Sequence, residues 1–336
     1  MSAAKEPMGP GGPVLALCGG IGGAKLALGL YKHLAPGALT VVVNTGDDFE
    51  HLGLHISPDI DTVLYTLSGS SNPETGWGRA NETWTFMAAL EGLGGETWFQ
   101  LGDGDLALHL ERTRRLHAGE SLSNVCAAFA GRFGLSARIL PMSDDPLRTL
   151  VHTPDGPLPF QHYFVRERCA PRVTGISFEG AEAARPNPDV LRALADPALA
   201  AVVICPSNPY LSVDPILALA GLRAALRNCA APVVAVSPLV GGRALKGPTA
   251  KIMQELGVPV TSRAVAEHYG DLIDGLVLDR ADAAEAEEIS LPARVTKTVM
   301  TSLDDRIALA REVLDFAAQL DRRSAPADRL REGAAS

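Results

Sequence analysis

A short apolar run followed by four glycines constrains the fold of this 336-residue chain more than any other feature. The run is Val14–Cys18, and a leucine-rich helical pattern begins directly after the glycines. A strand, a glycine turn and a helix N-terminus in succession form an anion site, because glycines let the backbone approach a phosphate and the free N–H groups of the first helical turn point at it. The predicted phosphate site consists of Gly19, Gly20, Gly22, Gly23 and Lys25.

The glycine turn matches neither of two common nucleotide motifs. Taken as Gly20-x-Gly22-x-x-Lys25, it lacks the third glycine of the dinucleotide fingerprint, and the spacing of a Walker A loop is absent. Two alternatives therefore stay open. The glycines either cradle a phosphate or allow tight packing, and Lys25 either contacts the phosphate or lies on the solvated surface.

Further apolar runs predict a parallel sheet. Residues 39–44 are continuous and β-branched, which suits a sheet covered on both faces, and they complete a strand–helix–strand unit. Strand patterns return at 200–205, 232–236 and 276–279, the last of which is expected to be the final strand. The predicted fold class is α/β, a Rossmann-like, mostly parallel sheet with helices on both faces and an inserted smaller α+β region.

The predicted division of the chain follows these patterns. Residues 98–105 are expected to form a short strand and a turn, and residues 215–227 one helix. The predicted parts are a mobile leader over 1–13, the Rossmann-like core over 14–61 and 186–322, an inserted lid or substrate region over 62–185, and a frayed tail over 323–336.

Carboxylates cluster behind the second predicted strand. Five acidic residues and Asn44 fall within 18 positions, at the edge of a parallel sheet where ligands bind. Clustered carboxylates repel one another unless they share a cation, and Mg²⁺ suits one or two carboxylates together with waters and phosphates. We predict a Mg²⁺ site formed by Asp61 with either Asp47 or Asp48, and Asp47 and Asp61 are the predicted catalytic residues. Asp59 either belongs to this site or caps the helix that begins there.

Polar residues in the neighbouring loops complete the predicted site. Trp77 lies in a glycine-rich loop, where its ring could stack on a flat ligand. Asp103 and Asp105 flank Gly104, and such a pair either orients a ligand or makes a turn. His109 has no paired ligand set and is expected to be structural. The remaining predicted substrate contacts are Asn44, Thr45, Asp48, Asp59, Trp77, Asp103, Asn208 and Ser237.

Composition excludes several classes of function. The chain carries 30 basic and 39 acidic residues, a net charge of −9, so it lacks the basic surface that binding to nucleic acid needs. No apolar stretch reaches the roughly 18 residues of a membrane span. The five cysteines are scattered and odd in number, which is typical of reduced, structural thiols. We expect a cytoplasmic protein.

Eight blocks of the chain form a distinctive set: GGIGGAK, NTGDDFEHLGLHISPDIDTVLYTLSG, NPETGWG, LGDGDLALHLERT, MSDDPLRT, FQHYFVRER, PSNPYLSV and SPLVGG. Together they resemble the 2-phospho-L-lactate transferase family of deazaflavin coenzyme biosynthesis. The resemblance covers nearly the whole chain. It implies a homodimer that transfers a phospho-acid from its guanosine diphosphate conjugate to the ribityl hydroxyl of 7,8-didemethyl-8-hydroxy-5-deazariboflavin, with release of GMP. It also implies that Asp47 helps to hold Mg²⁺ and that Asp61 lies beside the deazaflavin. Gly104 departs from the family, which usually has Arg or Lys there.

Two other classes of function remain as alternatives. A nicotinamide-dependent oxidoreductase would explain a glycine turn, but it predicts a third glycine and an acidic residue at the end of the second strand, which here ends in Asn44. A non-catalytic nucleotide-sugar-binding regulator of the gluconeogenesis-factor type would share the core and bind its ligand without releasing GMP. The sequence does not distinguish 2-phospholactyl, phosphoenolpyruvyl and 3-phosphoglyceryl donors.

Overall fold

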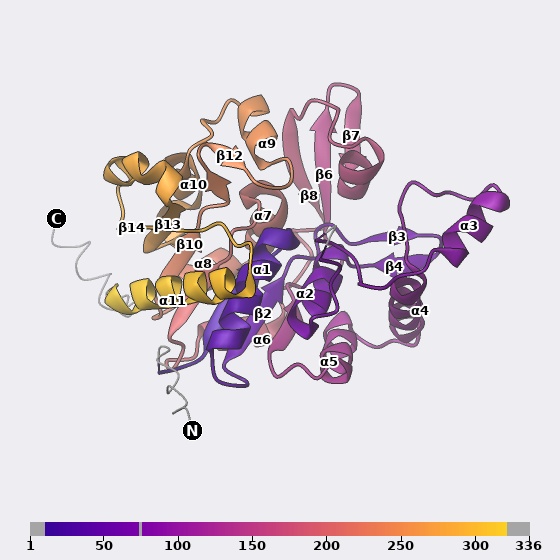
Figure 1. The fold of residues 1–336 in the computed structure, drawn as a ribbon, viewed down its shortest axis with the longest axis horizontal. Helices are drawn as coiled ribbons and strands as arrows, with labels where there is room; N and C mark the ends of the chain where they lie inside the picture. The colour runs from indigo at the N-terminus through magenta and orange to yellow at the C-terminus, as the bar shows by residue number, and fades with distance from the viewer. Residues whose placement is uncertain (1–10, 74–75, 321–336) are drawn as a thin grey trace.

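A seven-stranded sheet, parallel throughout, forms the centre of the molecule (Figure 1). The computed structural model describes residues 11–73 and 76–320. The strand order is β14-β13-β10-β9-β1-β2-β5. These strands are β1 (Val14–Cys18), β2 (Leu39–Val43), β5 (Arg138–Pro141), β9 (Ala201–Ile204), β10 (Val233–Val236), β13 (Gly275–Asp279) and β14 (Ala293–Thr296). The predicted α/β class with a parallel sheet is confirmed.

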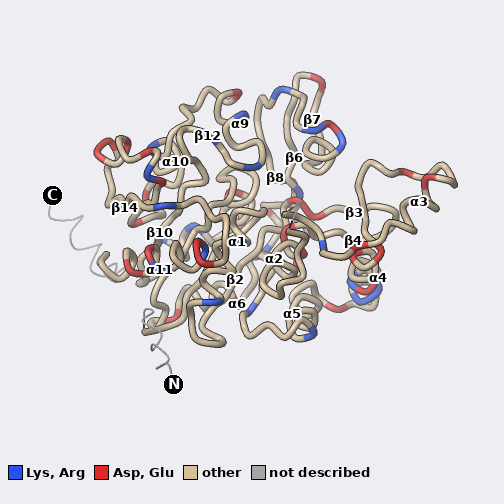
Figure 2. The backbone as a smooth tube through the Cα atoms, in the orientation of Figure 1, with Lys and Arg blue, Asp and Glu red and all other residues tan. Residues whose placement is uncertain are grey.

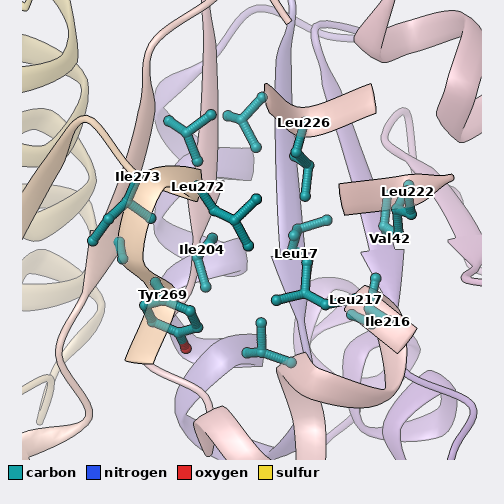
Figure 3. Packing of buried hydrophobic residues seen from close by; sticks show 14 of the residues in the cluster. Leu17, Val42, Ile204, Ile216, Leu217, Leu222, Leu226, Tyr269, Leu272 and Ile273 are labelled. Atoms are coloured by element: carbon teal, nitrogen blue, oxygen red, sulfur yellow. The ribbon is translucent and has the colours of Figure 1, made fainter. Parts of the chain in front are cut away.

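The central strands β1, β2 and β9 are buried at every position and apolar at all but Thr40, because both faces of the sheet are covered. Alternate side chains of β1 enter two different cores: Leu17 packs with Val42 and Ile204 on one face, whereas Ala16 and Cys18 belong to the core on the other face. Figure 3 shows the first of these cores, in which leucine and isoleucine side chains from neighbouring helices meet the sheet.

Helices cover both faces of the sheet. On one face α1 and α11 lie side by side, with α2 and α5 beyond them, and on the other face lie α6, α7, α8, α9 and α10 (Figure 1). The α-helices are α1 (Gly20–His33), α2 (Pro58–Ser68), α3 (Thr85–Gly92), α4 (Asp103–His117), α5 (Leu122–Arg132), α6 (Pro188–Leu194), α7 (Asp214–Ala218), α8 (Leu222–Asn228), α9 (Thr249–Glu255), α10 (Ser262–Tyr269) and α11 (Leu303–Gln319). The short π- and 3₁₀-helical segments are η1 (His162–Arg166), η2 (Pro209–Val213), η3 (Gly270–Leu272) and η4 (Arg280–Glu288).

Smaller antiparallel sheets stand at the carboxyl edge of the large sheet. They are the hairpins β3 (Phe49–His51) with β4 (Leu54–Ile56) and β11 (Leu239–Val240) with β12 (Arg243–Ala244), and a three-stranded sheet of β6 (Arg148–Thr153), β7 (Gly156–Pro159) and β8 (Gly175–Glu179). The hairpin β3–β4 and helix α3 project away from the sheet (Figure 1). The range 62–185, predicted as an insertion, also supplies the greater part of α2 and the edge strand β5 of the large sheet, which pairs in parallel with β2.

Three local predictions differ from the structure. Residues 276–279 are not the last strand, because β14 follows and pairs with β13. Residues 98–102 form no strand, and helix α4 already begins at Asp103. The helix expected over 215–227 is divided into α7 and α8, since Gly221 between them has a φ of 83° that ends regular helix.

The predicted leader and tail lie at the two ends of the chain. The predicted leader and tail fall mostly on residues 1–10 and 321–336, which lie outside the described residues. Within the described ranges, none of the helices combines the length and the apolar character needed to cross a membrane.

Candidate active site

A cleft of about 710 Å³ opens at the carboxyl edge of the sheet. The strand order reverses here, because β1 has β2 on one side and β9 on the other. In open α/β sheets the loops that leave two such strands separate and leave room for a ligand. The cleft is lined by the glycine turn after β1, the loop after β9, the start of α2, and segments of the smaller sheets and of the loop after β14.

The glycine turn packs tightly, as one of its two sequence-based interpretations predicts. A Cβ atom at Gly22 would lie 2.5 Å from the carbonyl oxygen of Pro206, and one at Gly23 would lie 2.5 Å from Ser207 Oγ, so these glycines allow close packing against the loop after β9. Gly20 has open space around it but a φ of 65°, which favours glycine. Gly19, Gly20 and Gly22 also line the cleft.

Protein groups already bind part of this turn. The N–H of Gly20 donates to Asp59 Oδ1 at 2.6 Å, and the N–H of Gly19 donates to Ser207 Oγ at 3.1 Å. Asp59 does not cap its own helix, one of the two predicted roles, because its carboxylate binds the start of α1 and links the acidic loop to the glycine turn. Two lysines, Lys25 and Lys246, line the same end of the cleft. Burial, together with the nearby positive charges of Arg306 and Lys246, lowers the pKa of Lys25.

Asn44 organises the acidic loop. Its Nδ2 donates to Asp47 Oδ1 and to Asp59 Oδ2, both at 3.0 Å, while its Oδ1 accepts the N–H of Gly46 at 2.8 Å. Gln161 approaches Asp47 Oδ2 at 3.4 Å from the far wall of the cleft. Asn44 is therefore a buried positioning residue, and it brings the carboxylates of Asp47 and Asp59 together at one point.

The surroundings of Asp47 and Asp59 disfavour the negative charges of these two carboxylates. Burial, and next the charges of Asp59 and Asp48, raise the pKa of Asp47 well above its ordinary value. Burial also raises the pKa of Asp59 from 3.8 to about 6, against the opposing effect of hydrogen bonds from Asn44 and Gly20. A cation between these carboxylates would relieve this repulsion.

Asp61 has a different partner, which the sequence analysis did not identify. Both of its oxygens receive hydrogen bonds from the guanidinium of Arg112, a side chain with no solvent exposure. His109 Nδ1 lies 3.5 Å from Asp61 Oδ2. Burial raises the pKa of Asp61, and the charges of Arg112 and His109 oppose that shift. The structure therefore pairs Asp61 with a buried arginine and brings Asp47 together with Asp59.

Most of the predicted site residues line the cleft. Those that do are Gly19, Gly20, Gly22, Lys25, Asp47, Asp59, Asp61, Trp77, Asn208 and Ser237. Those that do not are Gly23, Asn44, Thr45, Asp48 and Asp103.

The residues outside the cleft lining have structural partners. Asp48 is buried, and its Oδ2 accepts a hydrogen bond from Ser57 Oγ at 2.8 Å and lies 3.2 Å from His55. Thr45 is also buried. Asp103 accepts the N–H groups of Thr85 and Phe86, so its carboxylate caps the start of α3 instead of facing the cleft.

The loops after β9, β10 and β14 form the wall beside the glycine turn. Asn208 Oδ1 accepts the N–H groups of Tyr210 and Leu211, which leaves its Nδ2 without a hydrogen-bond partner among the described residues. The segment 298–301 lines the cleft and was not predicted. The carbonyl of Met300 accepts a hydrogen bond from Lys25 Nζ at 3.4 Å, and Thr298 is held by Asp279.

The opposite wall is aromatic. Phe99, Phe160 and Phe164 line it, and the rings of Phe160 and Phe164 stack with centroids 5.4 Å apart. Trp77 lies at the cleft with half of its surface exposed. Nearby, Gly104 leaves room for the guanidinium of Arg79, which a Cβ atom at residue 104 would contact. The guanidinium of Arg79 therefore places a basic group beside residue 104, although Gly104 itself has no basic side chain.

These features define a doubly wound α/β protein with a ligand-binding cleft. A doubly wound α/β fold presents, at its switch point, a glycine turn with two lysines, a group of buried carboxylates and an aromatic wall in one cleft. Figure 2 shows acidic residues gathered where β3 and α2 meet. Such a cleft suits a ligand with an anionic part and a flat, apolar part.

Comparison with known proteins then gives the family. Residues 14–314 match the family described as 2-phospho-L-lactate transferase CofD, and the chain belongs to it. A phosphoenolpyruvate transferase from Kitasatospora aureofaciens is 42% identical over 317 residues, which cover 91% of this chain and 98% of that protein. One from Mycolicibacterium smegmatis is 38% identical over 325 residues, covering 90% and 98%.

The fold is also seen in a solved structure. A crystal structure of a UPF0052 family protein from Bacillus halodurans superposes with a TM-score of 0.58 at 16% identity, and covers 90% of this chain and 99% of that one. At this identity the likeness concerns the fold alone. The family inferred from the sequence blocks is confirmed, and with it the class of transferase. The oxidoreductase and the non-catalytic regulator are therefore set aside.

Proposed function

We propose that this protein transfers a phosphoenolpyruvyl group from its guanosine diphosphate conjugate to the ribityl hydroxyl of 7,8-didemethyl-8-hydroxy-5-deazariboflavin. GMP is the second product. The acid is chosen from the three donors left open by the sequence because the similar relatives from Kitasatospora and Mycolicibacterium are named phosphoenolpyruvate transferases. The deazaflavin and the guanylyl group come from the resemblance of the sequence blocks to the family.

One observation carries this proposal: a single cleft contains a basic glycine turn, an aromatic wall and a group of carboxylates. The positive charges of Lys25 and Lys246 suit the phosphates of the donor. Phe160 and Phe164 suit the flat ring system of the acceptor. Both substrates can therefore meet in one cleft, as a direct transfer between them requires.

Asp47 and Asp59 fit a magnesium ion. Their carboxylates share one amide donor, and burial raises the pKa of each, so a divalent cation would offset a repulsion that the protein alone leaves in place. Carboxylate oxygens are the ligands that Mg²⁺ prefers. When bound, the ion would neutralise negative charge on the phosphates of the donor. Asp61, predicted as the second ligand, is here bonded through both oxygens to Arg112.

The side chains have distinct tasks in the proposed reaction. Lys25 and Lys246 hold the phosphates of the guanosine diphosphate conjugate. The side chain of Asn208 is fixed because its Oδ1 accepts two backbone N–H groups, and its Nδ2 donates a hydrogen bond to the same conjugate. Asp61, held by Arg112, orients the acceptor hydroxyl by accepting its hydrogen bond. The hydroxyl oxygen then forms a bond to the phosphorus that bears the acid, its proton passes to the carboxylate of Asp61, and the bond from that phosphorus to the GMP oxygen breaks, so that GMP leaves with the bonding electron pair. The chemistry needs positioning and charge neutralisation more than a covalent intermediate.

Measurement of GMP release tests this function. Purified protein is incubated with Mg²⁺, the deazaflavin and each of the three guanosine diphosphate conjugates, and the products are identified by mass spectrometry. We expect GMP and the phosphoenolpyruvyl-deazaflavin in equal amounts, and the highest kcat/KM with the phosphoenolpyruvyl donor. Release of no GMP from any donor would contradict the proposed transfer, whereas preference for another acid would change only the donor.

A further inference from the structure

Two aspartates at the start of α4 have different surroundings. Asp103 caps α3 through its bonds to Thr85 and Phe86, whereas Asp105, two residues further on, lines the cleft. The sequence predicts Asp103 as the substrate contact of this pair. Figure 2 shows the acidic start of α4 and the basic residues of its last turns, an arrangement that complements the helix dipole. The geometry thus makes Asp105 the carboxylate of this pair that a ligand can reach.

The carboxylate of Asp105 is held in place from two sides. Tyr65 Oη on α2 donates to Asp105 Oδ1 at 2.6 Å. His109, one turn along α4, places Nε2 3.4 Å from Asp105 Oδ2. The side chain of Asp105 keeps 16% of its surface exposed, while the His109 side chain is buried. Burial would raise the pKa of Asp105, but the nearby His109, the hydrogen bond from Tyr65 and the charge of Arg112 outweigh it and lower that pKa. Asp105 is therefore a fixed, charged acceptor of hydrogen bonds.

The neighbouring charges argue against a metal ion at this position. One ligand atom each from Asp61, Asp105 and His109 lies within 4.8 Å of the others, which is a possible metal geometry. Arg112, however, already donates to both oxygens of Asp61, and its positive charge would oppose a cation. Oδ1 of Asp105 is likewise occupied by Tyr65. The group that suits the remaining oxygen is a neutral donor such as a hydroxyl.

We infer that Asp105 binds the hydroxyl groups on the side chain of the acceptor. This rests on the proposed function, which brings a polyhydroxylated chain into the same cleft. The proposed function places the reacting hydroxyl at Asp61. The imidazole of His109 lies between the two aspartates, with Nδ1 facing Asp61 and Nε2 facing Asp105. Asp105 thus recognises the chain and not the ring, and it fixes which hydroxyl reaches Asp61.

The test compares two ligands and two variants. The ligands are the deazaflavin with its ribityl chain and the same ring system with a methyl group at that nitrogen, with binding followed by ligand fluorescence. The variants are Asp105→Asn and the matched control Asp103→Asn. We expect Asp105→Asn to weaken binding of the ribityl compound by about tenfold or more, as the loss of a hydrogen bond to a charged group does. Its affinity for the methyl compound should not change, and Asp103→Asn should change neither affinity.

The two-ligand design separates recognition from a structural effect. If Asp105 only supports the contact between α2 and α4, both ligands will bind more weakly, and the inference is overturned. Equal binding of the ribityl compound by the variant and the wild type overturns it as well. Asp105→Ser replaces Asp105→Asn if the latter does not fold, with the same expected result. Absence of GMP release by a wild type that binds the acceptor contradicts the proposed function alone. Failure of the wild type to bind the acceptor contradicts both.

Discussion

At the scale of single residues, the contact between Asp61 and Arg112 matters most for the candidate site. Arg112 has no solvent exposure, and its Nη1 and Nη2 groups donate to the two oxygens of Asp61. A buried ion pair of this kind contributes little net stability, but the loss of one partner leaves the other charged and unpaired. The pair therefore couples the orientation of a proposed catalytic group to the stability of the fold.

Asp61→Asn should reduce both activity and stability. We expect turnover to fall by orders of magnitude, because the acceptor hydroxyl loses the carboxylate that orients it. We expect the free energy of unfolding to fall by about 3–5 kcal/mol, because Arg112 is left buried without a negative partner. GMP release and urea unfolding measure the two effects.

A double variant separates these two effects. Asp61→Asn with Arg112→Met removes the unpaired charge and replaces it by an apolar side chain of similar length, so most of the lost stability should return. Activity should not return, since the carboxylate is still absent. Recovery of activity in the double variant would show that Asp61 serves only the fold.

At the scale of elements, the turn between β1 and α1 is fixed by the loop after β9. Ser207 Oγ donates to the carbonyl oxygen of Gly19 at 2.8 Å and accepts its N–H, so the two loops that flank the switch point are joined. A Cβ atom at residue 23 would lie 2.5 Å from Ser207 Oγ and 2.9 Å from Cys18 Sγ. Both atoms are buried and leave a side chain no room.

Gly23→Ala should destabilise the protein. We expect a loss of about 1–3 kcal/mol, typical of a side chain forced into a packed interior, with a further loss of activity as Gly19 and Gly20 shift. Gly92→Ala is the matched control: Gly92 lies in helix α3, nothing would contact its Cβ, and alanine there should be neutral or favourable by up to about 1 kcal/mol. Thermal unfolding of both variants measures the difference, and equal melting temperatures would contradict the packing argument.

At the scale of the whole molecule, the sequence predicted the features that follow from local residue patterns, which are the parallel sheet and the position of the cleft. The apolar runs predicted the parallel sheet, and the glycines and acidic residues that follow β1 and β2 identified the edge at which the cleft lies. Arg112 was missed, because it reaches Asp61 only through the packing of α4 on α2, and local sequence did not distinguish Asp105, which lines the cleft, from Asp103, which caps α3. The segment 298–301 reaches the cleft from the far end of the chain and has no distinctive motif. The homodimer stays a prediction, which light scattering would test.

The stability of the whole molecule should depend on pH in a way that magnesium changes. Asp59 binds its proton more tightly in the folded protein, where its pKa is about 6, than in the unfolded chain, where it is 3.8. A group with a raised pKa contributes its full stabilisation below about pH 4 and loses it as the pH rises through about 6. Without divalent cations, this carboxylate therefore destabilises the protein at neutral pH. The pKa of Asp47 is raised as well and acts in the same direction.

Magnesium should reverse that loss only where the carboxylates are ionised. Since protons compete with the ion for Asp47 and Asp59, we expect Mg²⁺ to leave the melting temperature unchanged near pH 5 and to raise it by a few degrees near pH 7.5, as binding at about 100 times Kd does. Differential scanning calorimetry with Mg²⁺ or with EDTA at equal ionic strength measures this. Asp59→Asn should abolish the shift, whereas Asp103→Asn, whose carboxylate caps α3, should keep it. A shift of equal size at both pH values, or one that persists in Asp59→Asn, would mean that the ion binds elsewhere, because protonation weakens a site built from Asp47 and Asp59 at the lower pH.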